Sequence, residues 1–171
     1  MKKLLILFDC DGVLWTPEKK GDYVSSVVSK FRRVSNKKLI READNSIFKL
    51  SDGVKQCFQH LIRLNEKVVV GIVSDNKFDT AKEVMMLFDL YKFVHKDAFN
   101  VKLWKGYCPK DRMVLEILEK PVFKNMPYEN VYLLDDKDYG KECRSIGVNF
   151  IQVCPDANLY KLVKDLVKDV E

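Results

Sequence analysis

Short runs of apolar residues alternate along the chain with segments in which apolar side chains recur every three or four positions. Three runs are typical of buried parallel strands, Leu4–Phe8, Val68–Val73 and Val131–Leu134, and Val148–Val153 predicts a further strand. Helical spacing predicts helices within residues 53–64, 81–88, 109–118, 140–146 and 156–167. This alternation predicts a three-layer α/β/α, Rossmann-like fold around a parallel sheet with right-handed crossovers.

Residues 16–50 interrupt this alternation. Thr16–Asp22 carries the Pro, Gly and charged residues typical of a loop. Phe31–Arg41 resembles two short strands about a polar Ser-Asn-Lys turn, although Tyr23–Ser29 could equally begin a helix. We predict a β-hairpin flap here, a minimal cap inserted into a single domain that spans residues 1–171. The flap is rich in Lys and Arg, which fits either a solvated face or a lid that faces a substrate.

Length and composition narrow the class of protein. A chain of 171 residues suits one domain, and 47% hydrophobic with 32% charged residues is typical of a globular protein. No apolar run approaches the roughly 20 residues that span a bilayer, and the first strand follows Met1-Lys2-Lys3 directly. We therefore expect no signal peptide and no membrane partner.

The cysteines and the net charge indicate compartment and partners. Five scattered cysteines without a Cys-x-x-Cys pair favour a reducing, cytoplasmic location and argue against a structural zinc site. Neither His60 nor His95 has a ligand partner at useful spacing. A net charge of +5 fits anionic, phosphorylated partners without implying nucleic acid.

Polar groups follow the predicted strands where each one ends. Asp9 and Asp11 follow the first strand, Ser74 the second, and Asp135 and Asp136 the third. Because parallel strands end at one edge of their sheet, we expect these groups to meet there. Two carboxylates about 4 Å apart repel by roughly 4 kcal/mol at an effective dielectric of 20. Mg²⁺ suits such a site, because it takes hard oxygen ligands and leaves room for phosphate oxygens.

Four motifs in order resemble the haloacid dehalogenase superfamily of aspartyl-phosphate phosphotransferases. The first motif is matched by Asp9-Cys10-Asp11-Gly12-Val13, and the second, a Ser or Thr that ends the next strand, by Ser74. The third, a lysine at a helix start, is best matched by Lys110, with Lys105 as the less favoured choice. The fourth, an acidic pair followed by a glycine, is matched by residues 135–140.

Within that superfamily the chain looks closest to the small magnesium-dependent phosphatases that lack a large cap. Leu14-Trp15, the run Leu87–Phe93 and the acidic pair 135–136 carry this likeness. One position departs from it, because Asp75 stands where that group usually has an arginine. The identity of the substrate therefore stays open.

The resemblance implies a role for each matched residue. Asp9 would be the nucleophile and Asp11 the general acid and base. Side chains alternate along an extended segment, so we expect Cys10 between them to point to the opposite side and to be a filler rather than a nucleophile. The residues expected around the substrate are Cys10, Gly12, Ser74, Asp75 and Lys110. The residues expected around Mg²⁺ are Asp9, Asp11 through its backbone carbonyl, Asp136 and Asp135, with Asp136 favoured as the direct ligand.

The resulting hypothesis is a magnesium-dependent phosphomonoester hydrolase that forms an aspartyl-phosphate. Its substrate would be a phosphorylated small molecule such as a phosphosugar, or a phosphoprotein carrying a phosphotyrosine-like group, since a short flap leaves room for a large molecule. A nucleotide or nucleic-acid end phosphatase is an alternative that only the basic flap supports. A non-catalytic phosphate-binding module is a further alternative. We expect a monomer or a small homo-oligomer.

Overall fold

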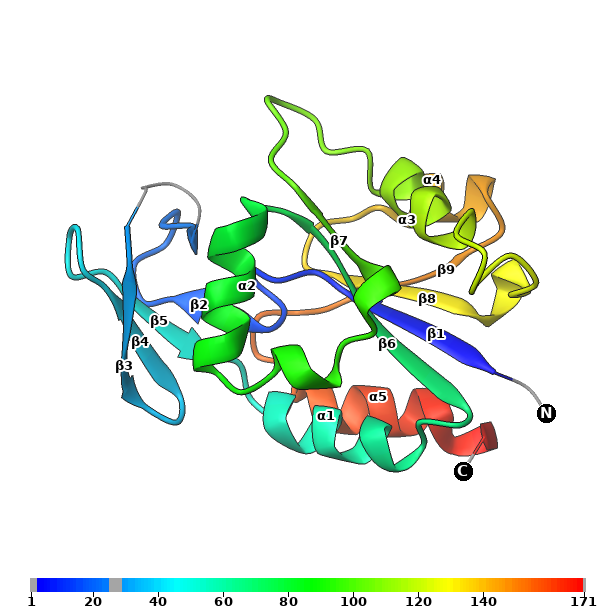
Figure 1. Ribbon diagram of the computed structural model, residues 1–171, viewed down its shortest axis with the longest axis horizontal. Coiled ribbons are helices and arrows are strands. Elements are labelled where there is room, and N and C mark those ends of the chain that lie inside the picture. Colours follow the sequence, from blue (N-terminus) through cyan, green and yellow to red (C-terminus); the bar gives the residue numbers. More distant parts are fainter. Residues whose placement is uncertain (1–2, 25–28, 171) are drawn as a thin grey trace.

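The computed structural model describes residues 3–24 and 29–170, and its centre is a five-stranded parallel sheet (Figure 1). In spatial order the strands are β7 (Phe99–Lys102), β6 (Val68–Asp75), β1 (Leu4–Phe8), β8 (Val131–Asp135) and β9 (Asn149–Gln152). The strand order reverses at β1, because β6 and β7 lie on one side of it and the later strands β8 and β9 lie on the other. Parallel strands with such a reversal place a crevice at their carboxyl ends. The predicted three-layer α/β/α fold is confirmed.

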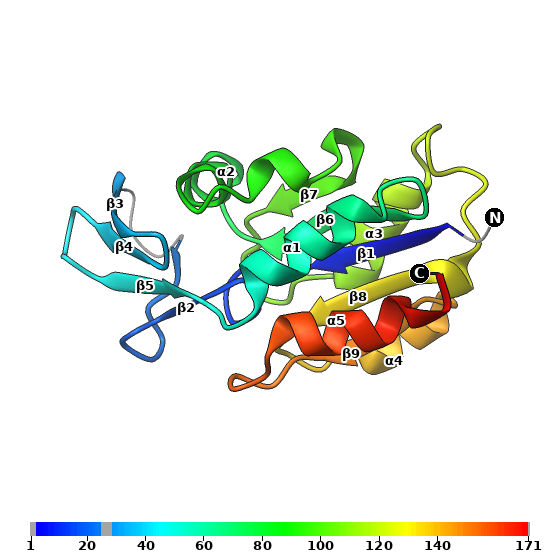
Figure 2. The same cartoon turned by 90° about the horizontal axis from the view of Figure 1, so that it is seen from below.

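Side chains on β1 alternate between two helical layers, which explains its continuous apolar run. Leu4, Ile6 and Phe8 belong to the same hydrophobic core as α1 (Val54–Arg63), α2 (Phe78–Leu87) and α5 (Leu159–Val167). Leu5 and Leu7 pack in the core formed with α3 (Lys110–Leu118) and α4 (Gly140–Ser145). Figure 2 shows α1 and α5 together on one face of the sheet. A strand covered on both sides needs apolar residues at every position.

Short 3-10 helices complete the described chain. They are η2 (Tyr91–Phe93), η3 (Lys96–Ala98), η4 (Tyr128–Asn130) and η5 (Lys168–Val170). No helix in residues 3–24 and 29–170 is long and apolar enough to cross a membrane. All five cysteines lie in this part of the chain as free thiols, and only Cys154 is exposed.

A second, antiparallel sheet replaces the predicted hairpin. It contains, in order, β2 (Trp15–Pro17), β5 (Ile47–Leu50), β4 (Lys38–Arg41) and β3 (Phe31–Ser35), and Figure 1 shows it beside α2. The hairpin β3–β4 is confirmed, but the prediction of a loop at 16–17 is wrong. Pro17 is tolerated because β2 lies at the edge of the sheet, where a missing N–H breaks no ladder. The alternative helix at Tyr23–Ser29 involves residues 25–28, which lie outside the described chain.

Arg41 is the buried centre of this small sheet. Its guanidinium donates to Asp22 at 2.5 Å, to Asp44 at 2.7 Å and to the carbonyl of Tyr23 at 2.8 Å. The hydroxyl of Ser46 also donates to Asp22. These partners come from the loops around residues 22–23 and 44–46, so the guanidinium is paired within the insertion.

The edge strand β7 was not expected. The aromatic residues around it predict a connecting segment, whereas Ile72 to Asp75 of β6 pair with Phe99 to Lys102. The strand has only four residues, and its second residue, Asn100, is a buried amide that donates to Met113 O at 2.8 Å. A run this short with a polar member gives no periodic signal.

Candidate active site

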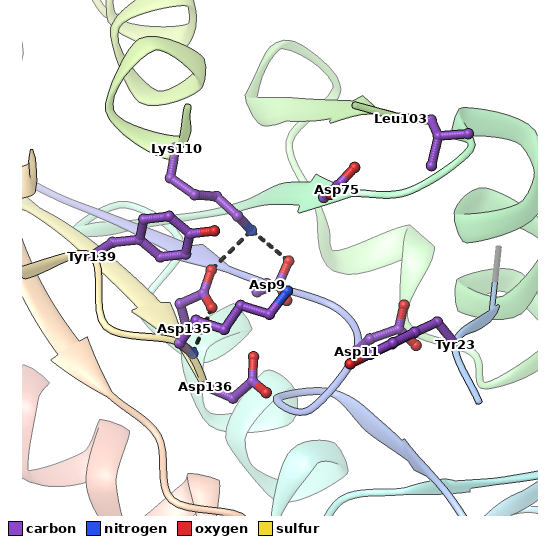
Figure 3. A pocket seen from close by; sticks show the side chains of 10 residues that line it. Asp9, Asp11, Tyr23, Asp75, Leu103, Lys110, Asp135, Asp136 and Tyr139 are labelled. Carbon is purple, nitrogen blue, oxygen red and sulfur yellow. Dashed lines mark hydrogen bonds and ion pairs between the residues drawn. The ribbon is translucent and has the colours of Figure 1, made fainter. Parts of the chain in front are cut away.

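A cavity of about 290 Å³ opens at the carboxyl edge of the parallel sheet (Figure 3). It is lined by Asp9, Asp11, Tyr23, Asp75, Leu103, Lys110, Asp135, Asp136, Lys137 and Tyr139. The residues come from the ends of three strands, the start of α3 and loops between them. Of the groups singled out at the strand ends, Asp9, Asp11, Asp135 and Asp136 line this cavity and Ser74 does not. Asp75, named above as a departure from the family pattern, also lines it.

Lys110 ties two strand ends together. Its Nζ donates to Asp9 Oδ1 at 2.6 Å and to the carbonyl of Val73 at 2.8 Å, and it lies 2.9 Å from Asp135 Oδ2. Burial opposes the charged ammonium, but the neighbouring carboxylates of Asp9 and Asp135 raise the pKa of Lys110 above its ordinary value. Lys110 is therefore protonated at neutral pH. Lys105, the other candidate, is exposed and does not line the cavity.

Asp11 is held apart from Asp9 by hydrogen bonds of its own. Its Oδ1 accepts from Trp15 Nε1 at 2.8 Å and from the backbone N–H of Val24 at 3.3 Å, and its Oδ2 accepts from Asn76 Nδ2 at 2.8 Å. Burial, followed by the charge of Asp9, raises the pKa of Asp11 to about 7. The carboxyl group is thus oriented by three donors and can exchange a proton near neutral pH.

Asp9, Asp135 and Asp136 form a carboxylate cluster. One oxygen of each lies within 4.8 Å of the others. Burial, followed by the charge of Asp9, raises the pKa of Asp135 to about 7 and also raises that of Asp136. The charge of Lys110 alone cannot offset three carboxylates. Hard oxygen donors at this spacing fit a small divalent cation such as Mg²⁺, which would relieve their repulsion. The side chain of Asp11 is not part of this cluster, so its predicted contact through the backbone carbonyl stays a prediction.

Gly12 is required where the first-motif turn passes the acidic pair. Its φ is +87°, and a Cβ atom built on it would lie 2.5 Å from both Cγ and Oδ2 of Asp136. Any L side chain would be strained and would also displace Asp136. The glycine therefore lets the two strand ends approach closely, rather than lining the cavity itself.

Cys10 and Ser74 lie behind the cavity. Both are buried, and neither lines the cavity. Burial, followed by the charges of Asp9 and Asp11, raises the pKa of Cys10. The position of the thiol fits the predicted role of filler, and a contact of Cys10 with a substrate stays a prediction. Side chains alternate along a strand, so Asp75 lines the cavity instead of Ser74. A contact of Ser74 with a phosphoryl oxygen stays a prediction.

Several residues of the site were missed by the sequence analysis. Lys137 and Tyr139 follow the acidic pair 135–136 closely, and that proximity could have identified them. Asn76 is fully buried two positions after Ser74 and could have been found in the same way. Tyr23 and Leu103 belong to loops without any motif, so no sequence signal marks them.

Comparison with known proteins places the chain in a family. The family described as Acid Phosphatase matches residues 2–169. No curated protein matches the chain significantly. The structure is similar to the HAD domain of effector protein Lem4 from Legionella pneumophila in an inactive mutant form, with a TM-score of 0.65, 16% identity and coverage of 98% of this chain and 93% of that one.

Two further structures share the fold. A HAD-superfamily hydrolase from Ehrlichia chaffeensis has a TM-score of 0.62 at 14% identity, with 99% and 98% of the two chains covered. The N-terminal, phosphatase-containing part of a Bacteroides fragilis protein, complexed with Mg, has a TM-score of 0.59 at 14% identity, with 95% of this chain and 39% of that chain covered. Because the family match spans nearly the whole chain, this protein belongs to the acid phosphatase family and is a phosphatase, and its fold is the one found in haloacid dehalogenase hydrolases.

Proposed function

We propose that the chain hydrolyses phosphate monoesters in a magnesium-dependent reaction through an aspartyl-phosphate on Asp9. The observation that carries the proposal is the division of the cavity's acids into two groups. Asp9 lies in a carboxylate cluster with Lys110, whereas Asp11 is held separately by its own donors. A nucleophile and a proton donor need such different surroundings.

The cation would be held by Asp9, Asp135 and Asp136. When bound, Mg²⁺ would offset negative charge on the transferring phosphoryl group. We favour Asp136 as a direct ligand, because Lys110 already pairs with Asp135 and Gly12 keeps open the space that Asp136 occupies.

Asp9 would attack the phosphorus atom with a carboxylate oxygen, and the bond from phosphorus to the ester oxygen would break. The protonated carboxyl group of Asp11 would give its proton to that oxygen, so the alcohol leaves neutral. In the second half, Asp11 would take a proton from a water molecule that attacks the same phosphorus. Asp9 is then released as a carboxylate together with inorganic phosphate. Lys110 would keep Asp9 oriented and face the phosphoryl oxygens.

The substrate would be a phosphorylated small molecule, such as a phosphosugar, or a phosphorylated side chain of a protein. Of the described part of residues 16–50, only Tyr23 lines the cavity. Lys38 and Lys49 pair with Glu18 on the small sheet and do not line it. The observations therefore support a solvated basic face more than a lid, and add nothing to the nucleic-acid alternative. The free cysteines support a reducing compartment, the cytoplasm.

The test is the release of nitrophenol from p-nitrophenyl phosphate by the purified protein, with Mg²⁺ and with chelator, beside Asp9→Asn. We expect activity only when both the cation and Asp9 are present. Acid quenching during turnover should trap phosphate on the wild-type protein and none on Asp9→Asn. If the wild type is no faster than Asp9→Asn with any divalent cation but still binds inorganic phosphate, the non-catalytic binding module replaces this proposal.

A further inference from the structure

The cavity has two halves, which Figure 3 separates clearly. Lys110, Tyr139, Asp135 and Asp136 lie on one side of Asp9. The residues on the other side of Asp9 are Asp11, Tyr23, Leu103 and Asp75. Because Asp11 protonates the leaving oxygen in the proposed reaction, the alcohol portion of the substrate must occupy its half of the cavity.

Asp75 gives that half an unusual charge. It is partly buried at the end of β6, and its Oδ1 accepts the backbone N–H of Trp104 at 2.8 Å. No Lys, Arg or His of residues 3–24 and 29–170 lies within ion-pair distance of its carboxylate. The other acids at this edge differ, because Lys110 pairs with both Asp9 and Asp135.

Asp75 is a poor neighbour for an ordinary phosphate ester. Mg²⁺ and Lys110 would both lie in the carboxylate cluster, and Lys137, the other basic residue that lines the cavity, has its ammonium beside the ring of Tyr23. The carboxylate of Asp75 therefore has no ion-pair partner among the described residues, and it lies on the leaving-group side of a substrate that is itself an anion. A substrate with a positive charge on its alcohol portion would turn this repulsion into attraction.

The walls around Asp75 also suit an organic cation. The exposed ring of Tyr23 already has the ammonium of Lys137 5.9 Å from its centre, and the side chain of Leu103 is 54% exposed beside Asp75. Aromatic faces attract cations, and an apolar side chain can cover the methylene groups that separate the charge from the phosphate.

We propose that Asp75 is a specificity-determining residue that selects phosphate monoesters whose alcohol portion carries an ammonium or guanidinium group. This inference rests on the proposed hydrolysis. The four motifs do not specify the alcohol portion of the substrate, and Asp75 lies beside the second motif and outside it. The inference therefore adds a feature of the substrate that the motifs leave open.

The test uses alkyl phosphates with two to six methylene groups, each paired with the alkyl phosphate of equal length that ends in an amino group. In the wild type we expect kcat/KM to favour the amino member by about tenfold at one or two chain lengths, the scale of one charge-assisted hydrogen bond. In Asp75→Asn the ratio should fall to about one. The amide oxygen of the new side chain can still accept the Trp104 N–H, so this variant removes the charge and keeps the loop attached.

Asp79→Asn is the matched control, since Asp79 is exposed on α2 and does not line the cavity. It should keep the wild-type ratio. Equal hydrolysis of both series by the wild type, or a preference that Asp75→Asn retains, overturns this inference alone. A wild type that hydrolyses neither series, and no more of p-nitrophenyl phosphate than Asp9→Asn does, overturns the proposed function and this inference with it.

Discussion

Two buried cations in this chain each pair with two aspartates, Lys110 at the edge of the parallel sheet and Arg41 inside the small sheet. Arg41 pairs with Asp22 and Asp44, and a hydroxyl and a carbonyl satisfy what remains of the cluster. Lys110 pairs with Asp9 and Asp135, but a third acid, Asp136, lies in the same cluster and a cavity opens over it.

The difference separates a structural ion cluster from a reactive one. Around Arg41 the carboxylates have lowered pKa values, because hydrogen bonds from Ser46 and from Arg41 stabilise their charged forms. Around Lys110 the pKa values of Asp135 and Asp136 are raised by burial and by Asp9. Acids whose pKa values are raised inside the fold indicate a functional site, here one that would bind a further positive charge.

The largest expected effect on activity follows from removing the positive charge of Lys110, the lysine of the reactive cluster. Lys110→Met keeps most of the side-chain volume and loses the charge that would face the phosphoryl group in the proposed reaction. We expect kcat/KM for p-nitrophenyl phosphate to fall by about 10²–10³. Lys105→Met is the control, because Lys105 is exposed outside the cavity, and it should match the wild type. A loss below about threefold in Lys110→Met would place this lysine outside the reaction.

The same substitution in the structural cluster should act on stability instead. Arg41→Met leaves Asp22 and Asp44 without their cation, and we expect the free energy of unfolding in urea to drop by about 2–3 kcal/mol. The kcat/KM of the folded fraction should change by less than about threefold. Arg32→Met, at an exposed position of β3, should change stability by less than about 0.5 kcal/mol. An Arg41→Met protein that is fully stable but inactive would reverse the two assignments.

Two glycines, one at the reactive cluster and one in the insertion, allow a comparison with a smaller expected effect. Gly12 and Gly21 have nearly the same positive φ, +87° and +85°, but only at Gly12 would a Cβ meet another group, Asp136. Both Gly→Ala changes should lower stability by about 1 kcal/mol. Gly12→Ala should also raise the Mg²⁺ concentration that gives half-maximal activity by about tenfold. Equal cation requirements in the two variants would show that Asp136 is not a ligand.

The smallest effect is a difference in how the two clusters respond to pH. Asp22 and Asp44 have lowered pKa values, so their contribution is present above about pH 4, near their unfolded pKa, and is lost as pH falls below it. Asp11 and Asp135, with pKa values raised to about 7, bind more protons when folded, so without cation they reduce stability as pH rises from about 4 to 7.

In chelator the Tm should therefore be highest near pH 4–5 and lower at pH 7. Adding Mg²⁺ should restore Tm at pH 7 and do little at pH 4, where the cluster is protonated. In Arg41→Met the loss of Tm below pH 4 should become shallower. A melting profile that chelator does not alter at pH 7 would contradict a cation site at Asp9.

The parallel sheet and the acidic edge could be predicted because their signals are local. Buried strands such as 4–8 and 68–73 are continuous apolar runs, and the acids follow them in the chain. The edge strands β7 and β2 could not be predicted. They have four and three residues, too few to show a periodic pattern of apolar side chains, and only their pairing with a neighbouring strand defines them. The orientation of β6 decides which of Ser74 and Asp75 faces the cavity, and the sequence does not define that orientation. The position of Tyr23 depends on the path of a long insertion, which the sequence does not define either.

The hydrogen bonds of Asp11 carry a consequence for engineering. Trp15 opens the small sheet and Val24 follows its first loop, so two of the three donors that hold the acid come from the base of the insertion. The outer strands β3, β4 and β5 donate nothing to Asp11. A designer could exchange 29–50 for a recognition module of another size and retain the Trp15 and Val24 donors to Asp11, provided that the graft begins beyond Val24 and restores a partner strand for Trp15.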